Sequence, residues 1–149
     1  MNVDYEIAFT NFQKKQILDK YGLDGGRTQK TIDSAFMGYM DKFMPADSNE
    51  MIKSMYRSTR VGSGEVNINV PYAHYQYEGE LYVDPKYGIG AFHDPQSGRY
   101  WSRRGIKKIP SGKKLNYHGG ANRGDHFIER TINVHYDDIL NAGQKEIDK

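Results

Sequence analysis

The sequence VPYAHYQYEG at residues 70–79 divides the chain into two regions of different character. Pro71 fixes its own φ and has no N–H to donate, so it ends a strand or opens a helical turn. Gly79 is suited to the left-handed residue that closes a short helix. Between them lie Tyr72, Tyr75 and Tyr77. Tyrosine rings prefer one buried and one solvated end, so we expect this stretch to lie between a scaffold and a partner-facing surface.

Upstream of this stretch, the sequence predicts an amphipathic helix. From residue 28 to residue 43, apolar side chains recur every three or four positions, which is the spacing of a single helix face. Pro45 ends the pattern. The predicted apolar stripe comprises Ile32, Ala35, Phe36, Tyr39, Met40 and Phe43.

The beginning of the chain alternates apolar and polar residues. Over residues 3–12 the alternation predicts a half-buried strand. Its apolar positions are Val3, Tyr5, Ile7 and Phe9. A short helix is expected over residues 13–20, with Ile17 and Leu18 facing inward and Gly22 closing it.

A second short helix and a hairpin are predicted before residue 70. Residues 47–49 offer N-cap side chains for a helix whose inward residues are Met51, Ile52 and Met55. Two extended runs follow, at residues 55–61 and 65–70, joined by Gly62-Ser63-Gly64. A glycine-rich connection between such runs is typical of a β-hairpin, with Val66, Ile68 and Val70 on one face.

Residues 84–124 differ from the rest in their proline and glycine content. The segment is far longer than ordinary connections, which span about 4–6 residues. It predicts either a further hairpin, with Gly98 turning between His93 and Trp101, or an irregular arm that serves a function. From Asp125 onward helical spacing returns, and Asp125 is the expected N-cap. The apolar face of that helix is predicted to be Ile128, Ile132, His135, Ile139 and Ala142.

Together these patterns predict one α+β domain over residues 1–149. Residues 1–83 and 122–149 form a compact helix-on-sheet unit, and residues 84–121 form an extended arm or an inserted hairpin. We expect an antiparallel sheet of about four to five strands. Helix 28–43 is expected to pack on one face of that sheet, with the C-terminal helix beside it.

The composition excludes several classes of protein. Lys and Arg number 21 against 19 Asp and Glu, so the overall charge predicts neither nucleic acid nor membrane as a partner. There is no cysteine, which excludes disulfides and thiolate metal sites. The sequence opens with no apolar h-region and has no run of membrane-spanning length, so we expect a soluble, unexported chain.

The one strongly charged segment is residues 99–114, which carries +7 in a chain whose net charge is +2. Its basic residues are Arg99, Arg103, Arg104, Lys107, Lys108, Lys113 and Lys114. With Tyr100 and Trp101 among them, this combination suits contact with phosphates and bases. A solvated loop, or one that meets an acidic neighbouring subunit, is the alternative.

Candidate catalytic residues are few. His118, Asn122, Asp125 and His126 suggest a metal-dependent nuclease, but no second His/Asp cluster is spaced to complete a site, and Asp125 is expected to cap a helix. Glu78 and Glu80 are a possible glycosidase pair, although a solvated turn explains them more simply. No phosphate-binding or nucleophile motif is present. We therefore expect a protein that is not an enzyme and that needs no cofactor or metal.

The chain carries YGLDGGRTQK at 21–30, MPADS at 44–48, the stretch at 70–79 and GDHFIER at 124–130. In the order and spacing of these motifs it resembles the minor capsid proteins of tailed phages of Gram-positive bacteria. The resemblance covers nearly the whole chain and extends, more distantly, to the tail-completion or neck proteins of long-tailed phages. The family usually has Thr-Gly where this chain has Ser48-Asn49, so a left-handed backbone is less readily expected there.

The resemblance implies a structural virion protein at the head–tail junction, in the host cytoplasm before assembly. Its partners would be identical copies in a ring, the adjacent connector and tail-terminator or tail-tube proteins, and either DNA in the lumen or an acidic adjoining ring. The expected interface residues are Tyr72, Tyr75, Tyr77, Glu78, Tyr82 and Trp101. The alternatives are a DNA-binding accessory domain or metal-dependent nuclease, and a cell-wall hydrolase that uses Glu78 or Glu80.

Overall fold

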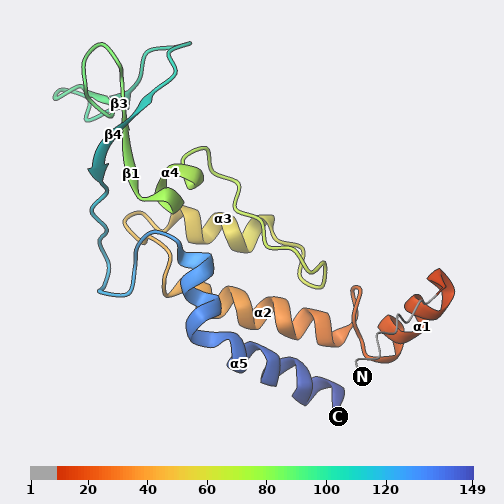
Figure 1. Cartoon of the computed structure of the whole chain (residues 1–149). Helices are drawn as coiled ribbons and strands as arrows, with labels where there is room; N and C mark the ends of the chain where they lie inside the picture. The colour runs from red at the N-terminus through yellow and green to blue at the C-terminus, as the bar shows by residue number, and fades with distance from the viewer. Residues whose placement is uncertain (1–9) are drawn as a thin grey trace, which may run out of the picture.

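The computed structural model describes residues 10–149, which form a helical body and a projecting arm (Figure 1). The helices are α1 (Asn11–Lys20), α2 (Arg27–Asp41), α3 (Glu50–Ser58), α4 (Ala73–Glu78) and α5 (Phe127–Ile147). The strands are β1 (Glu80–Val83), β2 (Phe92–His93), β3 (Tyr100–Trp101) and β4 (Ile109–Lys114). The predicted α+β class and the C-terminal helix are confirmed.

The core of the body lies where α2, α3 and the start of α5 meet. Its buried residues are Met37, Met40, Phe43, Met44, Met51, Ile52, Met55 and Phe127. Five of the eight are methionines, whose unbranched side chains fill irregular gaps. The predicted apolar stripe of α2 faces the core, but its Ile32 and Phe36 side chains are only half-buried. The inward residues predicted for α3 are all buried.

Helix α5 runs antiparallel to α2 (Figure 1), and three contacts fix their register. Arg27 Nε lies 3.1 Å from Glu146 Oε2 at one end, and the Tyr39 and His135 rings stack at 4.1 Å at the other. Between them, a Cβ at Gly143 would come within 2.9 Å of the Ile32 side chain. The glycine therefore allows the two helices to approach closely.

The start of α5 differs from the prediction. The N-cap is His126, in a left-handed conformation with φ 45°, and the Asp125 side chain does not cap the helix. The buried side chains near the start of this helix are Phe127 and Thr131, neither of which was in the predicted apolar face. Ile128 and Ile132 are left exposed.

The predicted hairpin at residues 55–70 is wrong. Helix α3 continues to Ser58, and residues 65–70 are extended without pairing to a strand among residues 10–149. Side-chain oxygens accept the backbone hydrogen bonds that a partner strand would have accepted. Asn69 N–H donates to Ser54 Oγ at 2.8 Å, and Asn67 N–H donates to Thr59 Oγ1 at 3.0 Å. The predicted alternation is nevertheless correct, because side chains 66, 68 and 70 pack against the core.

A buried carboxylate holds the turn of this segment. Asp33 Oδ2 accepts the N–H of Gly62 at 2.7 Å and that of Gly64 at 3.1 Å. Gln29 Nε2 donates to the other oxygen, Oδ1, at 2.8 Å. Helix α2 therefore positions the segment 62–70 through one side chain that the apolar pattern did not identify.

At the beginning of the chain, the predicted strand lies largely outside the described residues, which start at residue 10. Thr10 caps α1 through a capping box with Gln13, so the helix replaces the last two residues of that strand. Gly22, with φ 68°, follows the helix as expected. Ile17 was predicted to face inward but is 40% exposed.

Asn49 adopts the left-handed conformation, with φ 59°, at the start of α3. The absence of glycine there had made this backbone less expected. Asparagine is among the side chains that tolerate left-handed geometry, because its short amide can bond locally.

The single sheet of four to five strands is not confirmed. The described strands form two antiparallel pairs, β1 with β4 and β2 with β3, and both lie in the arm. Helix α2 therefore packs on helices and on residues 65–70 instead of on a sheet face. The predicted hairpin about Gly98 is confirmed, with Phe92 opposite Trp101 and His93 opposite Tyr100.

Candidate functional site

The arm contains the same tight turn twice, at residues 84–89 and 94–99. Each has the sequence Asp-Pro-x-x-Gly-x. In each, the Asp N–H donates to the carbonyl five residues later and the Gly N–H donates back to the Asp carbonyl, at 2.8 to 2.9 Å. Each glycine has a positive φ, 65° and 70°. This repeated hexapeptide is a pattern that could have predicted an ordered arm, and our sequence analysis did not use it.

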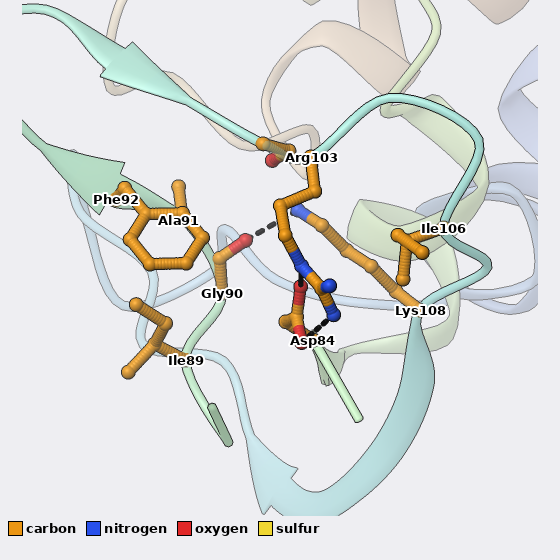
Figure 2. A pocket seen from close by; sticks show the side chains of 9 residues that line it. Asp84, Ile89, Gly90, Ala91, Phe92, Arg103, Ile106 and Lys108 are labelled. Carbon is orange, nitrogen blue, oxygen red and sulfur yellow. Dashed lines mark hydrogen bonds and ion pairs between the residues drawn. The ribbon is translucent and has the colours of Figure 1, made fainter. Parts of the chain in front are cut away.

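An ion pair joins the first turn to Arg103, two residues beyond β3 (Figure 2). Arg103 Nε donates to Asp84 Oδ2 at 2.7 Å and its Nη2 donates to Oδ1 at 2.8 Å. The Lys86 N–H also donates to Asp84, at 2.9 Å. The Arg103 hydrogen bonds, followed by the N–H groups of Lys86 and Tyr87, lower the pKa of Asp84 from 3.8 to about 2. A bidentate pair of this kind fixes both position and orientation.

The same group of residues encloses too little space for a substrate. The cavity beside Asp84 and Arg103 measures about 10 Å³, which is about one water molecule at most. Lys108 crosses it and donates from Nζ to the Gly90 carbonyl, as Figure 2 shows. We therefore assign this cluster to holding the arm together.

Aromatic rings cover one side of the arm. Tyr87 meets Phe92 at 5.3 Å, Phe92 stacks on Trp101 at 4.4 Å, and the Arg103 guanidinium lies 5.1 Å from the Tyr87 ring centre. Trp101 is 53% exposed and its neighbour Tyr100 is 73% exposed. The arm therefore holds large aromatic side chains in fixed positions while much of their surface stays in solvent.

The seven basic residues predicted to form one group have two different environments. Arg103 and Lys108 bond within the arm, as described above. The remaining five are exposed: Arg99, Arg104, Lys107, Lys113 and Lys114. The sequence pattern could not separate the two sets, because the partner acid Asp84 lies 19 residues before Arg103.

Two of the predicted interface tyrosines lie beside a hollow between α4 and the arm. Tyr75 and Tyr82 contact each other with ring centres 4.7 Å apart. They line a hollow of about 320 Å³ together with Glu80 and Leu115. Tyr72, the N-cap residue of α4, is exposed, and so is Glu78 at the end of α4. This surface is continuous with the base of the arm.

Tyr77 has a different place from the other tyrosines. Its ring packs edge-on against buried Phe127 at 5.0 Å and lies 5.2 Å from His126. Burial raises its pKa above 10.0. Tyr77 therefore connects α4 to the start of α5 and belongs to the edge of the core.

The return segment between β4 and α5 is tied to the body by residues that our sequence analysis did not identify. Tyr117 Oη donates to the Gln76 carbonyl at 2.6 Å, and burial raises the pKa of Tyr117 to about 12. The Arg123 guanidinium donates to the carbonyls of Asp41 and Met44, the latter at 2.8 Å, just after α2 ends. Such bonds satisfy carbonyls that a helix end leaves without partners.

The candidate catalytic residues do not converge within the described chain. Asp125 Oδ2 lies 3.6 Å from His126 Nδ1, but no group of three or more His, Cys, Asp or Glu side chains suited to a metal occurs in residues 10–149. Glu80 accepts the Gly112 N–H at 2.8 Å. Glu78 is exposed and does not line the hollow that contains Glu80.

Comparisons with protein-family models, with curated proteins and with solved structures found no match. Among the described residues, no helix combines the length and the apolar character needed to cross a bilayer. The described residues form an α+β fold with a projecting arm.

Proposed function

We propose that this chain is a structural virion protein of a tailed phage, which forms a ring at the head–tail junction and joins the capsid connector to the tail around the DNA path. The order of sequence motifs supports this role. The observation that carries it is the arm, which holds exposed Tyr100 and Trp101 on an ordered framework. Exposed aromatic residues in fixed positions are typical of residues that dominate binding at protein interfaces.

The construction of the arm suits binding between preformed surfaces. Two identical turns and the Asp84–Arg103 pair hold the β2–β3 hairpin on the β1–β4 ribbon. A surface that is ordered before it binds loses less conformational entropy on association. The arm projects beyond the helices (Figure 1), so it can reach a neighbouring subunit without rearrangement of the body.

The proposed partners are assigned to two kinds of surface, the exposed aromatic residues and the exposed basic residues. Identical copies would contact one another in a ring, with Tyr72, Tyr75 and the arm at the interfaces. The connector and the tail-terminator or tail-tube proteins would lie above and below. The five exposed basic residues would face DNA in the lumen or an acidic adjoining ring.

Electron microscopy of particles that carry a labelled copy of the chain tests the assignment. We expect the label at the junction between head and tail, in a ring of identical subunits. A label on the capsid surface, along the tail, or absent from particles would contradict the proposal.

A charge reversal tests the role of the arm. Arg104→Glu with Lys107→Glu changes two exposed arm residues, and Lys42→Glu with Lys145→Glu makes the same change of charge at the end of α2 and on α5. We expect the arm pair to lower incorporation into particles at least about tenfold, because cations that face DNA or an acidic ring become repulsive. Equal incorporation of the two double variants would contradict a role for the basic arm.

A DNA-binding accessory domain is the second candidate, and the exposed cations beside Tyr100 and Trp101 favour it. Five phosphate contacts would make the logarithm of the binding constant fall with the logarithm of salt concentration, with a slope of about −3.5 to −4.5. Tight binding of DNA by the isolated chain with such a slope would favour this candidate. Salt-independent or undetectable binding would exclude it.

A further inference from the structure

An apolar groove lies in the helical body. Its volume is about 320 Å³. Helix α2 forms its floor, residues 64–68 one wall and α5 the other. The apolar lining residues are Ile32, Phe36, Met40, Val66, Ile68, Ile128 and Ile139.

One wall of the groove is an extended segment whose backbone, among residues 10–149, is hydrogen-bonded on one side only. In an extended chain, successive residues direct their N–H and C=O groups to opposite sides. Asn67 and Asn69 direct theirs to Thr59 and Ser54, as described above. The N–H and C=O groups of Val66 and Ile68 therefore point away from α3, and no residue in the described range 10–149 forms a hydrogen bond with them.

An open strand edge beside an apolar groove is the arrangement that accepts an added strand. Main-chain hydrogen bonds to the edge supply affinity, and alternate side chains of the incoming strand enter the groove. The incoming segment must therefore alternate apolar and polar residues. This chain contains such a segment in residues 3–9, where Val3, Tyr5, Ile7 and Phe9 alternate with polar or small residues.

We propose that residues 3–9 of a neighbouring copy add as a β-strand to the Val66–Ile68 edge and place their apolar side chains in the groove. This inference rests on the proposed ring and names the contact that closes it. Residues 3–9 of one copy would meet the groove of the next, a head-to-tail contact of the kind that generates rings.

Helix α1 favours a neighbouring copy over the same copy as the source of the strand. None of the described side chains of α1 is buried, and the helix lies apart from α2, α3 and α5 (Figure 1). A ten-residue helix without packing is marginal in water, so α1 also needs a surface outside its own body. Seven extended residues beyond it span up to about 25 Å, which is enough to cross a subunit boundary.

A peptide of residues 1–10, added to a chain that lacks residues 1–9, tests the strand addition directly. We expect binding by calorimetry, with hydrogen exchange of the Val66 and Ile68 amides slowed at least about tenfold, because both amides become bonded. Ile7→Lys in the peptide should weaken binding about tenfold or more, and Glu6→Lys should not. Failure to bind, equal effects of the two lysines, or unchanged exchange at Val66 and Ile68 would overturn the proposal.

The full chain distinguishes this contact from the proposed function. In sedimentation experiments we expect Ile7→Lys to reduce self-association at least tenfold relative to Glu6→Lys. A full chain that stays monomeric while its Val66 and Ile68 amides are protected would overturn the neighbouring copy as donor. Rings that form equally well with Ile7→Lys would overturn this inference and leave the proposed function standing. Strand addition in a chain that is found away from the head–tail junction would overturn the proposed function and leave the strand addition standing.

Discussion

Gly79 lies where α4, β1 and the return segment meet, and its replacement by alanine tests how this junction is built. Its φ is 74°, a left-handed conformation that an L side chain adopts at a cost. A Cβ at this position would lie 2.7 Å from Asp125 Oδ2 and 2.8 Å from Asp125 Cβ. The second contact involves an atom next to the backbone, so it cannot be relieved by rotating the end of the side chain.

Gly64 provides a matched control within the body. Its φ is 76°, but the nearest contact of an added Cβ would be Gln29 Nε2 at 3.5 Å, an ordinary van der Waals distance. Gly64→Ala should therefore lower the free energy of unfolding only by the cost of placing an L side chain at a left-handed φ, about 1–2 kcal/mol. Gly79→Ala should lower the free energy of unfolding by the same cost and by about 1–3 kcal/mol more, because the added Cβ overpacks against Asp125.

Thermal unfolding followed by circular dichroism measures both variants. For a chain of this size each kcal/mol corresponds to about 2–4 °C in Tm, so we expect losses of about 2–8 °C for Gly64→Ala and about 4–20 °C for Gly79→Ala. In an Asp125→Gly background the additional loss at Gly79 should shrink, since the clashing Cβ is gone. Equal losses for the two single variants would refute the close approach of Gly79 to Asp125.

Three further changes test other parts of the structure. Asp33→Ala leaves the N–H groups of Gly62 and Gly64 without their acceptor and should lower the free energy of unfolding by about 2–4 kcal/mol in urea titrations, whereas Asp33→Asn should cost less. Gly38 lies in the middle of α2, and a Cβ added there meets no heavy atom of residues 10–149 within 4 Å. Gly38→Ala should therefore raise the free energy of unfolding by about 0.5–1 kcal/mol, because alanine favours the helix more than glycine does. A loss of stability would contradict the open space at this position. The pKa of Asp84 is about 2 in the folded chain, below its ordinary 3.8, so its contribution is present above about pH 4 and lost as the pH falls toward 2. Asp84→Asn should therefore flatten the acid dependence of arm stability between pH 4 and 2, measured by hydrogen exchange, and identical profiles would contradict the ion pair.

Features that depend on neighbouring residues could be predicted from the sequence. The 28–43 periodicity predicted α2, Gly79 favoured the end of a short helix where α4 ends, and Gly98 was the turn in one of the two alternatives for the arm. Each involves residues within about a dozen positions, where helical spacing and turn chemistry decide the conformation. The repeated Asp-Pro-x-x-Gly turn belongs to this group and could have been predicted.

Features that depend on distant residues were decided by the tertiary structure. Residues 65–70 have the alternation of a strand, but Ser54 and Thr59 on a preceding helix satisfy their backbone where a partner strand was expected. The basic residues of the arm divide into bonded and exposed sets only because Asp84 folds back onto Arg103.

By itself, the sequence determined which segments are helical, where the chain turns and which faces are apolar, because spacing and backbone preference act locally. The tertiary structure alone decided which apolar face meets which, whether a strand finds a partner, and which charges remain in solvent. Those outcomes depend on hydrogen bonds and packing between residues tens of positions apart, and a single sequence does not show which of these residues contact one another.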